Sequence, residues 1–159
     1  MANERKVSTC LWFDSNGEEA VKFYTSLIEG SHVSHISRYG KNGRMAEGLA
    51  MVVIFDLAGT PYMALNGGPV YKQSPAASIV VQCATQAEID RLWAALADGG
   101  KEMMCGWLTD RFGVSWQINY ARMGELMSNP DPAVSGRVMA AMMKMVKIDI
   151  AALDAAVKG

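Results

Sequence analysis

Hydrophobic and polar residues follow the same order in the two halves of this chain. In each half, a short apolar strand leads to a Ser/Thr-x-x-Glu motif, which is the pattern of a helix capping box, and then to an amphipathic helix. The boxes pair Ser15 with Glu18 and Thr85 with Glu88, so both pairs of equivalent positions lie 70 residues apart. We therefore predict two copies of one module, with first strands at about 7–13 and 77–83 and with Gly30 and Gly99 ending the helices.

The residues after each helix alternate in the way that strands do. In the first module we expect strands at about 33–39, 49–57 and 61–66, with a hairpin turn at about 58–60, and in the second at about 103–105 and 114–120. Strand–helix–strands modules in tandem predict an α+β fold with two mostly antiparallel sheets. We assign one domain over 1–159. It comprises module one at about 5–68, a linker at about 67–75, module two at about 76–122 and a helical tail at about 130–159.

The last predicted strand has two different faces. Its residues alternate between apolar and hydrogen-bonding side chains: Val114, Trp116 and Ile118 on one face, and Ser115, Gln117 and Asn119 on the other. A turn at 110–113 precedes it, where Gly113 is expected at a positive φ. This pattern is typical of a sheet that packs on helices behind and lines a wet cavity in front, and equally of a solvated outer face. Gln117 is therefore a candidate pocket residue.

The tail has a different pattern. Pro130, Asp131 and Pro132 start a helix, and Asp149 is placed to cap a last short one. The first of these helices carries a methionine-rich face, formed by Val138, Met139, Met142, Met143, Met145 and Val146. Methionine fills irregular gaps, so this face favours packing on the domain or on a second subunit over a ligand site.

Charge and composition narrow the possible partners. With a formal net charge of -1 and 19% charged residues, the chain has no basic footprint for nucleic acid or an anionic membrane. We find neither an apolar run of the roughly 18 residues that a membrane span needs nor the apolar core of a signal peptide, and we expect a cytoplasmic protein. The three cysteines, Cys10, Cys83 and Cys105, form no Cys-x-x-Cys pair, which indicates reduced thiols.

Several motifs together carry a family resemblance. They are CLWFD at 10–14, EEA at 18–20, FY at 23–24, LNGG at 65–68, LW at 92–93, CGWLTDRFGVSWQI at 105–118, AMMKM at 141–145 and KIDIA at 147–151. In these motifs the chain resembles the PhnB-like, 3-demethylubiquinone-9 3-methyltransferase-type branch of the glyoxalase/bleomycin-resistance/dioxygenase (vicinal oxygen chelate) superfamily, over nearly its whole length. The resemblance implies paired βαβββ modules, curved sheets around a cleft and a homodimer.

The same resemblance raises the question of a metal. Many members of the superfamily hold a divalent ion with one residue from each of four strands, commonly His, Glu or Gln. Placed on that pattern, this chain offers Ser8 or Thr9, Met63 or Leu65, Ser78, and Gln117. Hydroxyl, thioether and alkyl groups are poor ligands for a hard or borderline ion, so only Gln117 could bind. We therefore predict no metal site and no cofactor.

Other candidate chemistry is weaker. His32 and His35, three apart in a strand, are expected on opposite faces and so are not a metal pair. Cys105, near Trp107 and Arg111, could be an activated thiol, although a structural role is favoured. The methyltransferase label has no support from a glycine-rich turn between a parallel strand and a helix, because Gly67 and Gly68 follow a hairpin strand.

The resulting hypothesis is a metal-free, homodimeric protein that binds a small molecule of unknown identity. Trp12 and Trp107 would stack on a planar or apolar ligand, and Asn66, Gln82 and Gln117 would orient it. Three alternatives stay open. The chain could be a superfamily enzyme, either a metal-dependent lyase or dioxygenase or a methyltransferase acting on a ubiquinone-like phenol. It could be a dimerisation module built on the methionine-rich helix, or its cleft residues could merely fill a barrel.

Overall fold

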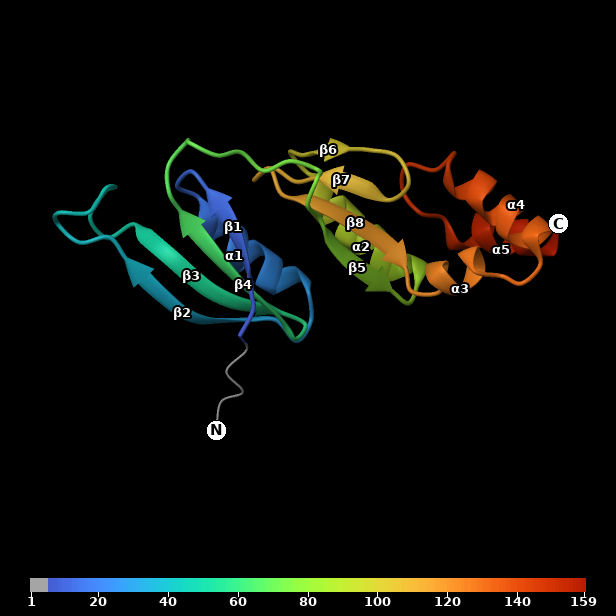
Figure 1. Ribbon diagram of the computed structural model, residues 1–159, viewed down its shortest axis with the longest axis horizontal. Coiled ribbons are helices and arrows are strands. Elements are labelled where there is room, and N and C mark those ends of the chain that lie inside the picture. The colour runs from blue at the N-terminus through green and yellow to red at the C-terminus, as the bar shows by residue number, and fades with distance from the viewer. Residues whose placement is uncertain (1–5) are drawn as a thin grey trace. The chain divides into compact units, whose positions relative to one another are not determined.

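The computed structural model describes residues 6–159, which form two compact units (Figure 1). The first unit ends at Gln73, and the second spans Ser74–Gly159. Each unit contains one four-stranded mixed sheet and one helix that packs on it, and the second unit also carries the C-terminal helices. The predicted α+β class is confirmed.

The two sheets share one topology. The first unit comprises β1 (Thr9–Phe13), α1 (Gly17–Leu27), β2 (His32–Arg38), β3 (Ala50–Leu57) and β4 (Thr60–Asn66), with strand order β1-β4-β3-β2. The second comprises β5 (Ile79–Cys83), α2 (Gln86–Ala97), β6 (Lys101–Glu102), β7 (Trp107–Thr109) and β8 (Ser115–Tyr120), with order β5-β8-β7-β6. In each sheet the first strand is parallel to the last, and the other neighbours are antiparallel. This is the βαβββ module that the family resemblance implied.

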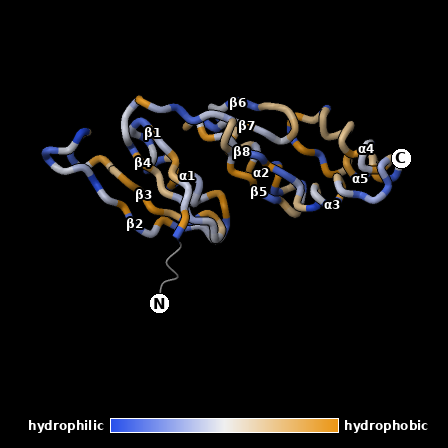
Figure 2. Tube along the Cα trace, viewed as in Figure 1, coloured by the Kyte–Doolittle hydropathy of each residue, from blue (hydrophilic) through white to orange (hydrophobic). Residues whose placement is uncertain are grey.

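Each sheet buries the face that its helix covers. In the first unit, Val21 and Tyr24 of α1 are fully buried with Phe55 of β3, and in the second, Leu92 of α2 is buried with Trp116 of β8. β3 is largely orange in Figure 2, whereas the loop between β2 and β3 is mostly blue. Apolar burial on one face of each sheet is therefore the main stabilising term in both units.

The two predicted capping boxes have different outcomes. At α2 the prediction is confirmed: the N–H of Glu88 donates to Thr85 Oγ1 at 3.2 Å, and the Glu88 carboxylate accepts from the N–H of Ala84 at 2.9 Å. At α1 it is wrong. The N-cap is Asn16 rather than Ser15, and its side chain makes no capping hydrogen bond among the described residues.

The strand predicted at 103–105 is also wrong. Cys105 and Gly106 both have positive φ, 62° and 79°, which turns the chain between the short strands β6 and β7. Gly113 has φ 89°, as predicted.

The tail forms α3 (Met123–Met127), α4 (Pro132–Met142) and α5 (Ile150–Lys158). Asp149 caps α5, as predicted, and α4 starts where predicted, with Asp131 as its cap. The short helix α3 was not predicted. No helix within residues 6–159 combines the length and apolarity needed to cross a lipid bilayer.

Candidate functional site

The second sheet carries a row of polar side chains on the side away from the buried core. Val80 of β5 lies beside Gln117 of β8, which lies beside Trp107 of β7, and Gln82 lies beside Asn119. These positions alternate with Trp116 and Ile118, which are fully buried. We call this surface the polar sheet face; it consists of Ser78, Val80, Gln82, Trp107, Thr109, Ser115, Gln117 and Asn119.

Hydrogen bonds within the polar sheet face satisfy only part of its groups. The amide of Gln117 donates to Ser78 Oγ at 2.9 Å, and the hydroxyls of Thr109 and Ser115 lie 3.4 Å apart. In contrast, Asn119 Oδ1 is buried and has no hydrogen-bond partner within residues 6–159. An unpaired buried acceptor costs about 1–3 kcal/mol, so this oxygen needs an explanation.

Three of the five predicted ligand-binding residues, Gln82, Trp107 and Gln117, lie together on the polar sheet face. Gln82 is exposed, and the other two are half-buried. The predicted alternation along β8 places Gln117 on this face, and the register of β5 and β7 with β8 places Gln82 and Trp107 beside it. Their role in binding remains a prediction.

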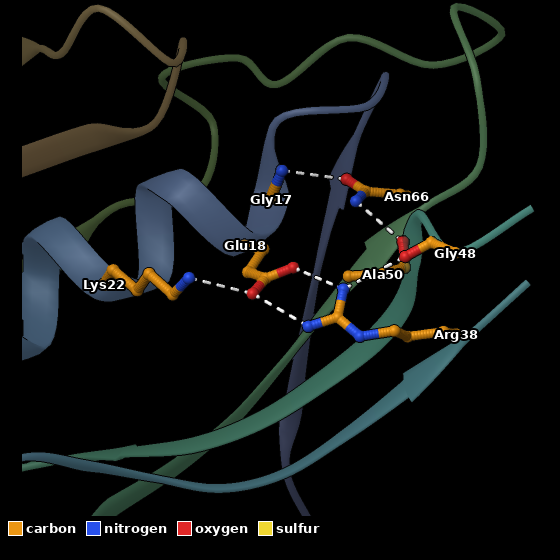
Figure 3. A network of polar contacts seen from close by, with 7 residues as sticks. All are labelled: Gly17, Glu18, Lys22, Arg38, Gly48, Ala50 and Asn66. Atoms are coloured by element: carbon orange, nitrogen blue, oxygen red, sulfur yellow. Dashed lines mark hydrogen bonds and ion pairs between the residues drawn. The ribbon is translucent and has the colours of Figure 1, made fainter. Parts of the chain in front are cut away.

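The other two predicted residues, Trp12 and Asn66, lie in the first unit. Asn66 is the register partner of Phe13, which follows Trp12 in β1, so Trp12 and Asn66 lie on opposite faces of the first sheet. Asn66 is 2% exposed. Its Oδ1 accepts from the N–H of Gly17 at 2.8 Å, and its Nδ2 donates to the carbonyl of Ala50 at 2.9 Å (Figure 3). Asn66 therefore joins the start of α1 to β3, and both ends of its carboxamide are used inside the unit.

Trp12 anchors the segment that follows β4. Its Nε1 donates to the carbonyl of Gly68 at 2.9 Å, and its ring meets Tyr71 edge-on with centroids 4.9 Å apart. A Cβ on Gly67 would come within 2.2 Å of the indole, so glycine is required there. The backbone N–H groups of Gly67 and Gly68 donate to the carbonyls of Phe13 and Asp14. This glycine pair thus closes onto β1 and is not a nucleotide-binding turn.

A charged network lies beside Asn66 (Figure 3). Two nitrogens of Arg38 donate to the two oxygens of Glu18 at 2.9 and 3.1 Å, and Lys22 Nζ lies 2.9 Å from the same carboxylate. The hydrogen bonds from Arg38 and then from Lys22 lower the pKa of Glu18 to about 2. The network links α1 to the end of β2.

The corresponding face of the first sheet is apolar. Trp12 lies beside Leu65, which lies beside Val52, and Cys10 lies beside Met63, which lies beside Ile54. These side chains are half-buried, apart from the exposed Cys10. We call this surface the apolar sheet face.

The residues present do not fit the divalent ion that many superfamily members hold. Ser78 and Gln117 are hydrogen-bonded neighbours, but a hydroxyl and an amide are neutral donors, and Met63 offers only a thioether. Within residues 6–159, no three His, Cys, Asp or Glu side chains lie close enough together to hold a metal ion.

The two histidines differ from expectation. An irregularity between Val33 and His35 pairs His32 with Asp56 and His35 with Ile54. Because Asp56 and Ile54 are two residues apart, both histidines lie on one face of the strand, and the prediction of opposite faces is wrong. Both are exposed.

The thiols also differ from one another. Burial is the main reason that the pKa of Cys83 rises to about 12, so this thiol stays protonated and behaves as a small hydrophobic group. Cys105 is half-buried at the turn before β7.

Comparison with known proteins identifies the family. The family described as 3-demethylubiquinone-9 3-methyltransferase matches residues 5–119. Residues 120–159 lie outside this match, although the family resemblance of the sequence motifs extended to residue 151. The PhnB protein from Bacillus cereus is 37% identical, with a TM-score of 0.70 over 74% of this chain and 100% of its own. Protein PA1353 from Pseudomonas aeruginosa is 27% identical, with a TM-score of 0.61 over 74% of this chain and 98% of its own.

More distant structures share the fold alone. The fosfomycin resistance protein FosX from Listeria monocytogenes is 14% identical, with a TM-score of 0.52 over 77% of this chain and 96% of its own. A search of curated proteins gave no match. The chain belongs to the PhnB-like 3-demethylubiquinone-9 3-methyltransferase domain family, and its fold is that of the vicinal oxygen chelate superfamily.

Proposed function

We propose that this protein binds a small organic molecule on the polar sheet face, without a metal ion. The observation that carries the proposal is the buried, unpaired Oδ1 of Asn119. It lies in the same strand as Gln117 and beside Gln82, so an acceptor that lacks a partner adjoins two further carboxamides. A ligand with an N–H or O–H donor would supply the missing hydrogen bond.

The neighbouring side chains define the rest of the ligand. Trp107 lies beside Gln117 and offers a flat apolar surface, and Val80 on the other side of Gln117 is 46% exposed. A planar molecule could lie along this row, with its polar edge toward Gln82 and Asn119. Binding surfaces for small molecules typically combine such apolar area with a few directed polar groups.

The test is a binding screen followed by one substitution. Quinones, phenols, aromatic amides and antibiotics are titrated while tryptophan fluorescence is recorded, and Trp107→Phe identifies the part of the signal that comes from this face. We expect Gln117→Leu to weaken the binding of any hit by roughly tenfold, because a directed hydrogen bond contributes about 1 kcal/mol and the Ser78 hydroxyl loses its partner.

Asn42→Ala is the matched control, since it removes an exposed amide from the loop between β2 and β3. It should leave binding unchanged. A screen with no binder, or equal binding by the Gln117→Leu variant, would contradict the proposal.

A second candidate is catalysis on a phenol, as the family description suggests. The unpaired acceptor on Asn119 favours a phenol as substrate, because the O–H of a phenol can donate a hydrogen bond to it. The methyl ether formed from that phenol has no such donor. Incubation of a phenol hit with a methyl donor, followed by mass spectrometry, separates the candidates. A gain of one methyl group supports the enzyme, and unchanged ligand supports binding alone.

A further inference from the structure

The segment between α4 and α5 is fastened to the second module by hydrogen bonds. The N–H groups of Cys105 and Gly106 donate to the carbonyls of Met145 and Val146, both at 2.7 Å. Ile148 is fully buried, and a Cβ on Gly106 would come within 2.9 Å of its side chain. We call residues 143–150, which end with the first residue of α5, the docked segment.

Gln86 at the start of α2 holds the other end of the docked segment. Its Nε2 donates to the carbonyl of Ile148 at 3.0 Å, and its Oε1 accepts from the N–H of Ile150 at 2.8 Å. Lys147 adds an ion pair with Asp90. With both ends fixed, the docked segment keeps its place against the turn at Cys105.

This docking brings two sulfur atoms together. Cys105 Sγ lies 3.7 Å from Met143 Sδ, although the residues are 38 apart in sequence. A metal–sulfur bond of about 2.3 Å and a near-tetrahedral angle place two ligating sulfurs roughly 3.8 Å apart, so the observed separation matches that of two sulfurs bound to one ion. A third thioether, that of Met104, is adjacent in sequence and 49% exposed, and Met143 is 57% exposed.

We propose that Cys105 and Met143, with Met104 as third ligand, form a binding site for Cu(I). Thiolate and thioether sulfur are soft ligands that select Cu(I), whereas zinc sites in proteins use Cys, His and carboxylates, and harder ions use oxygen. On binding, the thiol of Cys105 releases its proton to solvent and the thiolate balances the charge of the ion. The site shares no residue with the polar sheet face and does not depend on the proposed function.

The test is a titration of the full, reduced chain with Cu(I) under anaerobic conditions. A coloured Cu(I) chelator competes for the ion, and native mass spectrometry counts bound copper. We expect one copper per chain, which an excess of Zn(II) or Mg(II) does not displace. Cys105→Gly should abolish this binding. Met143→Leu and Met104→Leu conserve volume and should each weaken binding by roughly tenfold or more.

Glycine is chosen to replace Cys105 because this substitution should not disturb the fold. Because Cys105 has φ 62°, glycine relieves an unfavourable backbone conformation, so the variant should keep its fold and raise Tm by about 2–4 °C. If it does not fold, Cys105→Ser replaces it. Cys10→Ser removes an exposed thiol of the first unit and should keep full binding.

Each result decides the question. Copper binding that survives Cys105→Gly, or that Cys10→Ser abolishes, would overturn the proposal. Binding that is lost with Cys105 but unaffected by Met143→Leu would show an isolated thiol and would also overturn it. Weakening by Met143→Leu alone would keep the sulfur pair and remove Met104 from the site.

Discussion

The two sheets share a strand order but present opposite chemistry on the face away from the buried core. In the first sheet this face carries Trp12, Leu65 and Val52 in one row, and in the second it carries Val80, Gln117 and Trp107. The first face offers apolar side chains, which make no directed hydrogen bonds, and the second offers amides that can orient a bound molecule. The repeat therefore preserves the backbone and leaves the face chemistry free to diverge.

The two strands that follow the helix also differ in length between the two sheets. β2 and β3 of the first sheet have seven and eight residues, whereas β6 and β7 of the second have two and three. Where the second sheet is short, the turn at Asp110 and the docked segment complete the module. The first module is thus stabilised mainly by long strand pairs, and the second by particular side chains and turns.

The largest expected difference concerns the turns that precede the last strands. Asp110 is 4% exposed and accepts from the N–H groups of Phe112 and Val114 and from Trp116 Nε1, at 2.8, 3.0 and 2.8 Å. Asp110→Ala should lower the free energy of unfolding by about 3–4 kcal/mol, since buried donors lose a charged acceptor. Asp56→Ala, which removes the acceptor that β3 offers to the N–H of Gly59 in the exposed turn before β4, should cost about 1 kcal/mol.

Urea denaturation of both variants measures this difference. Equal losses would show that the second module does not depend on its turn more than the first.

The next effect separates two asparagines in equivalent last strands. Both polar groups of Asn66 are hydrogen-bonded, whereas Asn119 Oδ1 has no partner in the described part of the chain. Asn66→Ala should therefore lower the free energy of unfolding by about 2–3 kcal/mol. Asn119→Ala should not lower it, because the substitution removes a buried acceptor that has no partner. Denaturation without ligand measures both. A large loss at Asn119 would mean that its side chain stabilises the fold.

The smallest expected effect depends on pH. The pKa of Glu18 is lowered from 4.5 to about 2 in the folded state, so its ion pairs stabilise the fold above about pH 4.5 and lose that effect as the pH falls toward 2. The contribution should be about 1 kcal/mol or less, because Arg38 and Lys22 are largely exposed. The stability difference between the unaltered chain and Glu18→Gln should thus shrink as the pH is lowered.

Glu125→Gln is the matched control, since Glu125 pairs with Arg122 on the surface of the second unit. Its effect should be smaller throughout. A pH-independent difference at Glu18 would contradict the assignment.

Local patterns predicted much of this fold. The alternation of Val114, Trp116 and Ile118, the positive φ of Gly113 and the caps at Thr85 and Asp149 depend on residues that are close in sequence, and all are confirmed. The same alternation placed Gln82 and Gln117 on one face. The homodimer and the ligand remain predictions.

The failures come from contacts that are distant in sequence. Ser15 does not cap α1, because Asn66, 49 residues from Gly17, supplies the acceptor for its first turn. A strand irregularity near Ser34 places His35 on the same face as His32, and no residue pattern in this strand predicts the irregularity. The contact of Cys105 with Met143 likewise requires a docked segment whose partners lie on α2.

The contact between Gly67 and the indole of Trp12 constrains how this chain can change over generations. Because the ring occupies the space of any larger side chain at 67, that position cannot vary while Trp12 remains. A smaller residue at 12 would first have to open the space, and it would also release the carbonyl of Gly68 from its donor. The two positions should therefore covary among descendants of this sequence, with bulk at one excluding bulk at the other.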